Sequence, residues 1–254
     1  LAAGWLELLR YSTWQSIRLL DWFLAMRISG WSLRLFAGLV VPASALPCLC
    51  LFDVDRTLTG QQELLAPQCP QNLVMPGVKD SAYSGGNLTL SQVGQSLTGT
   101  FCSSCLVGII TAGDVSGPNS QERQVLVQRL PQSQVLSHQW SGPSAQGEAR
   151  RNCTPADAQS MLVAGCVDGS KQEAAKGMLL LLSKQGINIS TSQVWHFDDR
   201  ANNIEPFRGT GMNAREISCL TRDQKQGTGV CGATTQEILQ KPGVALCGSE
   251  SLVV

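Results

Sequence analysis

Two aspartates separated by one residue, Asp53 and Asp55, are the side chains of this sequence best placed to do chemistry. They follow an apolar run, Leu46 to Phe52, which is typical of a buried parallel strand. Alternate side chains of a strand point the same way, so both carboxylates can face the crevice where open α/β sheets bind ligands. Because close carboxylates repel, one pKa rises unless a cation lies between them. The pair therefore indicates a bound metal ion, or one acid working with one base.

Further polar groups also follow predicted strands. Thr111 ends an apolar run that begins at Leu106, and Asp198 and Asp199 end a strand predicted from Gln193. The carboxyl ends of parallel strands meet at one edge of a sheet, so these side chains are expected to lie close to the first aspartate pair.

A lysine is the last candidate group, at the start of a helix predicted at Ser170–Lys184, with Ser170 as N-cap and Glu173 three residues on. Both Lys171 and Lys176 are possible. Counted from Lys171, apolar residues recur on one helix face, at Ala174, Ala175, Met178, Leu179 and Leu182. That face would pack on the sheet and leave Lys171 free to point at the site, so we prefer Lys171.

These residue types suit the chemistry of a phosphate monoester. A carboxylate that attacks this anion is repelled unless a cation neutralises the phosphoryl oxygens, and Mg²⁺ is commonly held by one or two carboxylates plus waters and phosphate. Asp53 and Asp198 could supply those carboxylates. The Thr111 hydroxyl, backbone N–H groups and the lysine could hold the other phosphoryl oxygens. Attack by a carboxylate would form an aspartyl-phosphate.

The sequence Asp53-x-Asp55-x-Thr57-Leu58-Thr59 after a hydrophobic strand resembles the first motif of the haloacid dehalogenase (HAD) superfamily. Thr111, the helix lysine and the Asp198–Asp199 pair follow in the order of the other three motifs, so the resemblance spans about residues 48 to 204. The segment from Asp198 to Ile204 is similar to a branch with two adjacent aspartates followed by Asn-Ile. Arg56 is a departure, because most members have glycine there.

The resemblance implies catalytic roles. Asp53 would be the nucleophile and a metal ligand. Asp55 would protonate the leaving group and then activate water, and members with dehalogenase chemistry lack this second acid. Lys171 would take part in catalysis and bind phosphate, together with Thr111 and Ala112. The implied Mg²⁺ ligands are Asp53, Asp55 through its backbone carbonyl, Asp198, and Asp199 in an assisting role.

The expected function is that of a Mg²⁺-dependent phosphatase acting on phosphate monoesters through an aspartyl-phosphate. The alternative is a catalytically silent binding or scaffold protein of the same fold. The 254 residues carry 19 basic and 19 acidic side chains, and this balance argues against a nucleic-acid-binding protein. No sequence element identifies a substrate, so broad activity on small phosphate esters is expected.

Strands that alternate with helices predict an α/β fold, with a Rossmann-like parallel sheet and helices on both faces. The intervals between motifs leave no room for a large cap domain, so residues 60–86 would form only a loop or hairpin flap. Other predicted elements are a helix at Leu90–Leu97 capped by Asn87 or Thr89, a helix at Ser120–Leu130, a short strand near Val135, strands at Met161–Val167 and Glu216–Leu220, a glycine-rich turn at Gly227–Gly232 and a helix at Thr235–Gln240.

The N-terminal part of the chain, which begins with Leu, predicts a route to the secretory pathway. Residues 1–25 are an uncertain extension, either an amphipathic helix or upstream sequence. Residues 26–45 have the layout of a signal peptide cleaved after Ala45, ahead of a catalytic domain at 46–254. Pro42 and Pro47 disfavour a membrane-spanning helix, and an organelle-targeting leader and a cytoplasmic location remain as alternatives. Three glycosylation sequons, at Asn87, Asn152 and Asn188, support export.

The ten cysteines agree with an exported protein. Disulfide bonds are the first interpretation, buried free thiols the second and a zinc site the third. Only Cys102 and Cys105 have the Cys-x-x-Cys spacing of zinc ligands, and just two histidines are available to complete a site.

Overall fold

A computed structural model describes residues 47–130, 136–142 and 150–249 of the chain. The expectations for residues 1–25 and 26–45 and for a strand near Val135 lie outside these residues. In the part described, no helix is long and apolar enough to cross a membrane.

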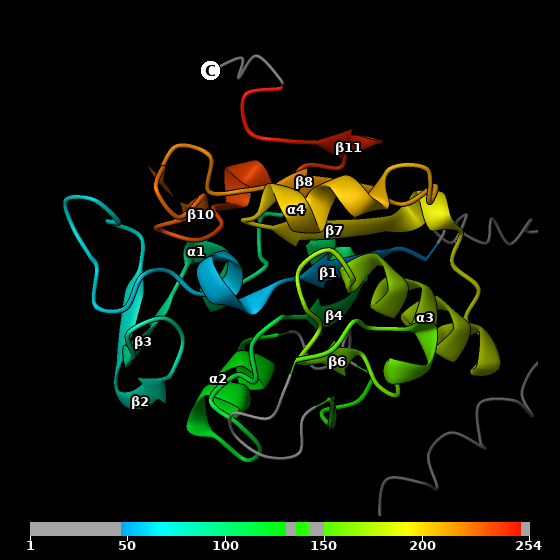
Figure 1. The fold of residues 1–254 in the computed structure, drawn as a ribbon, viewed down its shortest axis with the longest axis horizontal. Coiled ribbons are helices and arrows are strands. Elements are labelled where there is room, and N and C mark those ends of the chain that lie inside the picture. Colours follow the sequence, from blue (N-terminus) through cyan, green and yellow to red (C-terminus); the bar gives the residue numbers. More distant parts are fainter. Residues whose placement is uncertain (1–46, 131–135, 143–149, 250–254) are drawn as a thin grey trace, which may run out of the picture. The chain divides into compact units, whose positions relative to one another are not determined.

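A parallel sheet forms the centre of the fold, with strand order β11-β8-β7-β1-β4-β6-β5 (Figure 1). Every neighbouring pair in it is parallel. The strands are β1 Leu49–Phe52, β4 Leu106–Ile110, β5 Trp140–Ser141, β6 Leu162–Val163, β7 Val194–Asp198, β8 Asn213–Glu216 and β11 Val244–Ala245. The α/β class and the parallel sheet predicted from the sequence are confirmed.

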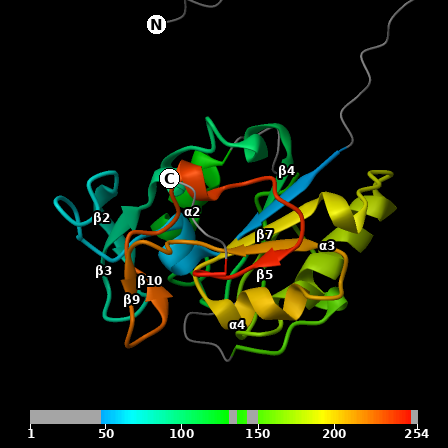
Figure 2. The same cartoon turned by 90° about the horizontal axis from the view of Figure 1, so that it is seen from above.

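The two faces of β1 are buried in different hydrophobic cores, as the alternation of strand side chains requires. Cys50 and Phe52 belong to the core that also contains residues of α1 (Gln92–Gln95) and α2 (Gln121–Arg129). Leu49 and Leu51 belong to the core that contains residues of α3 (Lys171–Lys184) and α4 (Ala201–Ile204). Helices therefore lie on both sides of the sheet, as Figure 2 shows for α2 and α3.

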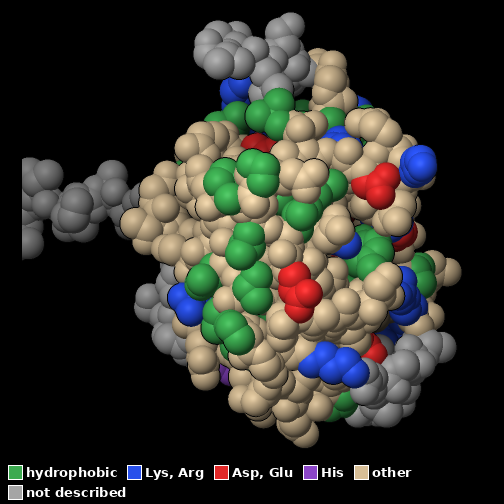
Figure 3. All heavy atoms as spheres, turned by 90° about the vertical axis from the view of Figure 1, so that its left-hand side faces the viewer, with side chains coloured by type: hydrophobic (Ala, Val, Ile, Leu, Met, Phe, Trp, Pro, Cys, Tyr) green, Lys and Arg blue, Asp and Glu red, His purple; other side chains and the backbone are tan. Residues whose placement is uncertain are grey.

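An antiparallel hairpin of β2 (Leu73–Asp80) and β3 (Gly86–Leu90) follows the first motif. Half of the β2 residues are exposed, while the β3 side chains Leu88 and Leu90 are buried. The molecular face that carries this hairpin has hydrophobic side chains interspersed with acidic and basic ones (Figure 3). The hairpin is thus attached to the rest of the protein through buried β3 side chains and through Met75 and Val78 of β2, which pack on the core.

The predicted helix at Leu90–Leu97 is wrong in its start and its cap. Thr89 lies in β3, where its hydroxyl accepts a hydrogen bond from the Glu63 backbone N–H (2.7 Å), and Asn87 accepts one from Gly77 (3.0 Å). These side chains are already used in the hairpin. The helix itself, α1, is shorter, and its first turn is capped by Ser91, whose hydroxyl accepts from the Gly94 N–H at 3.0 Å.

Other boundaries also differ from the predictions. The predicted Met161–Val167 strand is only the two-residue β6, and the strand predicted at Glu216–Leu220 lies earlier, as β8, because the chain turns at Ser218 with a φ of 58°. The glycine-rich turn belongs to a small hairpin, β9 Arg222–Asp223 and β10 Thr228–Gly229. Short 3₁₀ helices lie at Phe101–Ser104, Pro155–Asp157, Thr191–Gln193, Glu205–Phe207 and Thr235–Glu237.

All ten cysteines form disulfide bonds, so the zinc and free-thiol interpretations are wrong. Cys102 and Cys105, the two with zinc-like spacing, bond to Cys50 and Cys48. The five pairs are Cys48–Cys105, Cys50–Cys102, Cys69–Cys231, Cys153–Cys166 and Cys219–Cys247. Such a set is typical of an oxidising, secretory-type compartment.

The Cys69–Cys231 bond spans 162 residues, the longest separation of the five. Replacing both cysteines with serine should lower the free energy of unfolding by about 2–5 kcal/mol, because the unfolded chain regains conformational freedom. Guanidinium chloride unfolding of this double variant measures the loss. Thiol alkylation of the denatured, unreduced wild-type protein should label no cysteine, and labelled cysteines would contradict the five bonds.

Candidate active site

The first motif leaves the sheet at the carboxyl end of β1, the strand flanked by β7 and β4. The Asp53 N–H donates to the Phe197 carbonyl of β7 (3.0 Å), and the chain then forms a tight turn over Val54–Leu58. Asp53 is buried and Asp55 is half-buried, and both line a cavity of about 610 Å³. The two aspartates predicted from the sequence therefore face the crevice at this sheet edge.

Lys171 lies at the first position of α3 and is buried, with 1% of its surface exposed. Its ammonium nitrogen lies 2.7 Å from Asp53 Oδ1 and 2.6 Å from Asp198 Oδ2. Burial alone would lower the pKa of Lys171, but the charges of Asp198 and Asp53 outweigh burial and raise this pKa above its usual value. The lysine is charged between two carboxylates.

Lys176 lies elsewhere on the same helix. It is exposed, and its ammonium pairs with Glu173 at 2.7 Å. The structure thus brings Lys171, not Lys176, to the predicted site. The predicted capping box at the helix start does not form, because the Ser170 hydroxyl oxygen accepts from the Cys153 N–H (3.0 Å) while the hydroxyl donates to the Val167 carbonyl (2.8 Å).

Asp198, the last residue of β7, has both carboxylate oxygens in use. Oδ2 accepts from Lys171, while Oδ1 accepts from the Arg200 N–H (3.0 Å) and the Asn203 side-chain amide (3.1 Å). Burial alone would raise the pKa of Asp198, but Lys171 and a contact with His196 (3.4 Å) hold this pKa well below its usual range. Asp198 is a fixed anion beneath the cavity and is absent from its lining.

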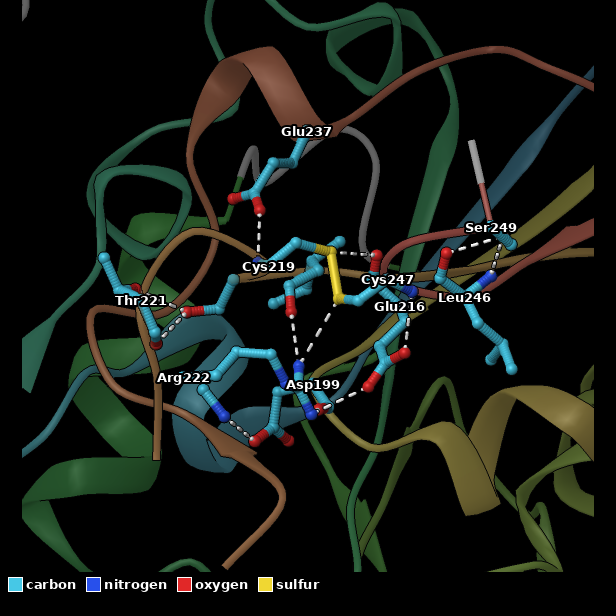
Figure 4. The surroundings of a disulfide bond; sticks show 12 residues. Asp199, Glu216, Cys219, Thr221, Arg222, Glu237, Leu246, Cys247 and Ser249 are labelled. Atoms are coloured by element: carbon cyan, nitrogen blue, oxygen red, sulfur yellow. Dashed lines mark hydrogen bonds and ion pairs between the residues drawn. A yellow bond between two sulfur atoms is a disulfide. The ribbon is translucent and has the colours of Figure 1, made fainter. Parts of the chain in front are cut away.

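Asp199 does line the cavity. Its Oδ2 accepts from the Gly229 N–H at 2.7 Å, and Arg222 donates to its backbone carbonyl at 2.9 Å (Figure 4). Burial, and then the charges of Asp198 and Asp53, raise the pKa of Asp199 well above its usual value. Carboxylate oxygens of these three aspartates lie within 4.8 Å of one another.

This cluster fits a hard divalent cation by its donor atoms. Burial, opposed by Lys171 and reinforced by the neighbouring aspartates, raises the pKa of Asp53 to about 7. Carboxylate oxygens are the ligand type that Mg²⁺ prefers, and the raised pKa values of Asp53 and Asp199 reflect negative charges crowded together. If all are ionised, the three aspartates and Lys171 carry two net negative charges, which one divalent cation neutralises.

Thr111 directly follows β4 and is buried. Its hydroxyl accepts from the Gly113 N–H at 3.4 Å. The next two residues, Ala112 and Gly113, line the cavity. Gly113 passes so close to Asp55 that an added Cβ would lie 2.9 Å from the Asp55 carboxylate. The turn after β4 therefore lies beside the first motif, at the sheet edge where the sequence placed Thr111.

The structure also contains a second acidic cluster, which the sequence did not predict. Its members are Asp55, Asp80 and Glu122. Asp80 ends β2 and Glu122 lies in the first turn of α2, two elements whose sequences carry no catalytic motif. Burial, followed by the charge of Asp80, raises the pKa of Asp55 to about 6. A group with this pKa can both donate and accept a proton near neutral pH.

Arg56 and Arg200, each next in the sequence to one of the aspartate pairs, both have defined partners. Arg56 is buried with a φ of 65°, and its guanidinium lies 4.4 Å from the centre of the Tyr83 ring. Arg200 pairs with Asp168 at 3.0 Å. His196 is buried and stacks on Phe207, in keeping with a structural role.

Comparisons of the chain with protein-family models, with curated proteins and with solved structures found no match. The functional assignment therefore rests on the site geometry.

Substituting Lys171 with methionine should destabilise the protein by about 3–5 kcal/mol at neutral pH, because it leaves Asp53 and Asp198 buried without their cation. The control Lys176→Met removes only an exposed pair and should cost less than about 1 kcal/mol. Urea unfolding of both variants measures the difference. Equal losses for the two would contradict the buried arrangement of Lys171.

Proposed function

We propose that the protein is a Mg²⁺-dependent phosphatase that acts on phosphate monoesters through an aspartyl-phosphate at Asp53. The observation that carries this proposal is the arrangement of Asp53 on the cavity wall, in contact with the buried Lys171 ammonium at 2.7 Å. Asp55 lies two residues away on the same wall, with a pKa of about 6 that burial and Asp80 raise. A nucleophile, a cation and an acid are thus close together.

Asp53, Asp199 and the Asp55 backbone carbonyl would hold the Mg²⁺. We assign the second carboxylate ligand to Asp199 rather than to Asp198, because Asp199 lines the cavity while both oxygens of Asp198 are engaged by Lys171, Arg200 and Asn203. When bound, the ion would neutralise charge on the phosphoryl oxygens. Asp198 then acts as a positioning residue for Lys171.

The reaction would proceed in two steps, formation of the aspartyl-phosphate and its hydrolysis. In the first, an Asp53 oxygen attacks phosphorus, the bond to the alcohol oxygen breaks, and protonated Asp55 gives its proton to that oxygen. In the second, Asp55 takes a proton from a water that attacks the phosphorus, which releases phosphate and the Asp53 carboxylate. The backbone of the β4 turn at Ala112 and Gly113, which line the cavity, would face the phosphoryl oxygens. Lys171 and Thr111, which lie just beneath the lining, would hold Asp53 and this turn in position.

Substituting Asp53 with asparagine should lower kcat on p-nitrophenyl phosphate with Mg²⁺ by at least about 1000-fold, or about 4 kcal/mol, because an amide is a poor nucleophile. The matched control is Asp223→Asn, because the asparagine Oδ1 can still accept from the Lys225 and Gln226 N–H groups in a turn far along the chain from the site. This control should keep wild-type activity.

Equal rates for Asp53→Asn and wild type would contradict the proposal. Tight binding of Mg²⁺ and beryllofluoride, a phosphoryl mimic, without turnover of any ester would favour the silent binding protein instead.

A further inference from the structure

The cavity carries an excess of negative charge that a phosphate substrate alone does not explain. Seven of the side chains that line it are carboxylates, and only two, Arg150 and Arg200, are cationic. A Mg²⁺ ion and Lys171 would offset part of this charge next to Asp53. A phosphate ester with a neutral alcohol would bring more negative charge into the remainder of the cavity, so the lining favours a substrate that is itself partly cationic.

The excess is concentrated in the cluster of Asp55, Asp80 and Glu122, whose carboxylate oxygens lie within 4.8 Å of one another. Glu122 is 1% exposed. Its Oε2 accepts from the Ser116 hydroxyl at 2.5 Å, whereas its Oε1 accepts no hydrogen bond from the described residues. A buried carboxylate oxygen without a donor is costly, and here it belongs to a cavity-lining group.

Among residues 47–130, 136–142 and 150–249, no lysine or arginine forms an ion pair with any of these three carboxylates. The Arg56 guanidinium stacks on Tyr83, and its charge acts on Asp55 and Asp80 without forming an ion pair with either. Burial, and then the charges of Asp80 and Asp55, raise the pKa of Glu122 well above its usual value. The cluster is therefore suited to a cation that comes from outside the chain.

Asp80 is fixed in place for such a cation. Its Oδ2 accepts from the Gln62 side-chain amide (2.9 Å) and its Oδ1 from the Ala82 N–H (2.8 Å), and each oxygen keeps a further lone pair. An ammonium group has three N–H donors and matches a set of carboxylate acceptors. A divalent cation would also suit the oxygens, and loss of a bound ion on substitution of Glu122 is the result that would identify it.

We propose that the cavity accepts phosphate monoesters of amino alcohols, with Asp80 and Glu122 binding the ammonium group of the alcohol. This inference rests on the proposed phosphatase function, because Asp55 must contact the ester oxygen on one side and the ammonium site on the other. The short distances within the cluster favour a spacer of about two carbons between that oxygen and the nitrogen.

The test compares 2-aminoethyl phosphate with 2-hydroxyethyl phosphate, which is close in size and lacks the positive charge. Calorimetry with Mg²⁺ and the Asp53→Asn variant measures binding without turnover. The amino ester should bind at least about tenfold more tightly. Adding Glu122→Gln should reduce the preference to about twofold or less, and Asp80→Asn provides a second variant if the first is unstable. The matched control, Glu173→Gln, alters a half-exposed carboxylate on α3 that does not line the cavity and should retain the preference.

The outcomes separate this inference from the proposed function. Equal binding of the two esters, while wild type hydrolyses both through Asp53, would overturn the inference and leave the phosphatase standing. Preferential binding of the amino ester without hydrolysis would support the ammonium site and overturn the phosphatase. Loss of one bound divalent ion in Glu122→Gln, with no preference between esters, would overturn the inference in favour of a second metal site.

Discussion

The buried ammonium of Lys171, in contact with Asp53 and Asp198, is the interaction on which the rest of the site depends. A charge removed from water costs several kcal/mol unless its partners are close, and both carboxylates lie within 2.7 Å of it. Asp53 follows β1 and Asp198 ends β7, so the lysine connects the start of α3 to two adjacent strands. The same contacts hold Asp53 at the cavity wall and leave Asp199 to face the cavity.

The disulfide bonds support this arrangement from both sides of the site. Cys48–Cys105 and Cys50–Cys102 link the segment of β1 to the chain just before β4, and these strands deliver Asp53 and Thr111. On the other side, Cys219–Cys247 lies beside Arg222, which pairs with Glu216 (2.7 Å) and donates to the Asp199 carbonyl (Figure 4). Covalent links thus hold the segments before β4 and after β8 beside the strands that carry the site residues.

The sequence predicted the parts of the site that depend on local pattern. Apolar strands that end in polar residues placed Asp53, Thr111 and Asp199 correctly at one sheet edge, and helix periodicity distinguished Lys171 from Lys176. The cluster with Asp80 and Glu122 could not be predicted, because a hairpin and a surface helix bring these residues together only in three dimensions. The different roles of the adjacent Asp198 and Asp199 could not be predicted either. Lys171 pairs with Asp198 while Asp199 faces the cavity, and this choice depends on how α3 packs against the sheet.

Chemical trapping of the covalent intermediate tests the central claim most directly. Borohydride reduction during turnover of a phosphate ester with Mg²⁺ should convert the phosphorylated aspartate to homoserine, and mass spectrometry should locate this change at position 53 alone. The Asp53→Asn variant should yield none. Continued turnover with residue 53 unmodified, or with the modification at another carboxylate, would contradict Asp53 as the nucleophile.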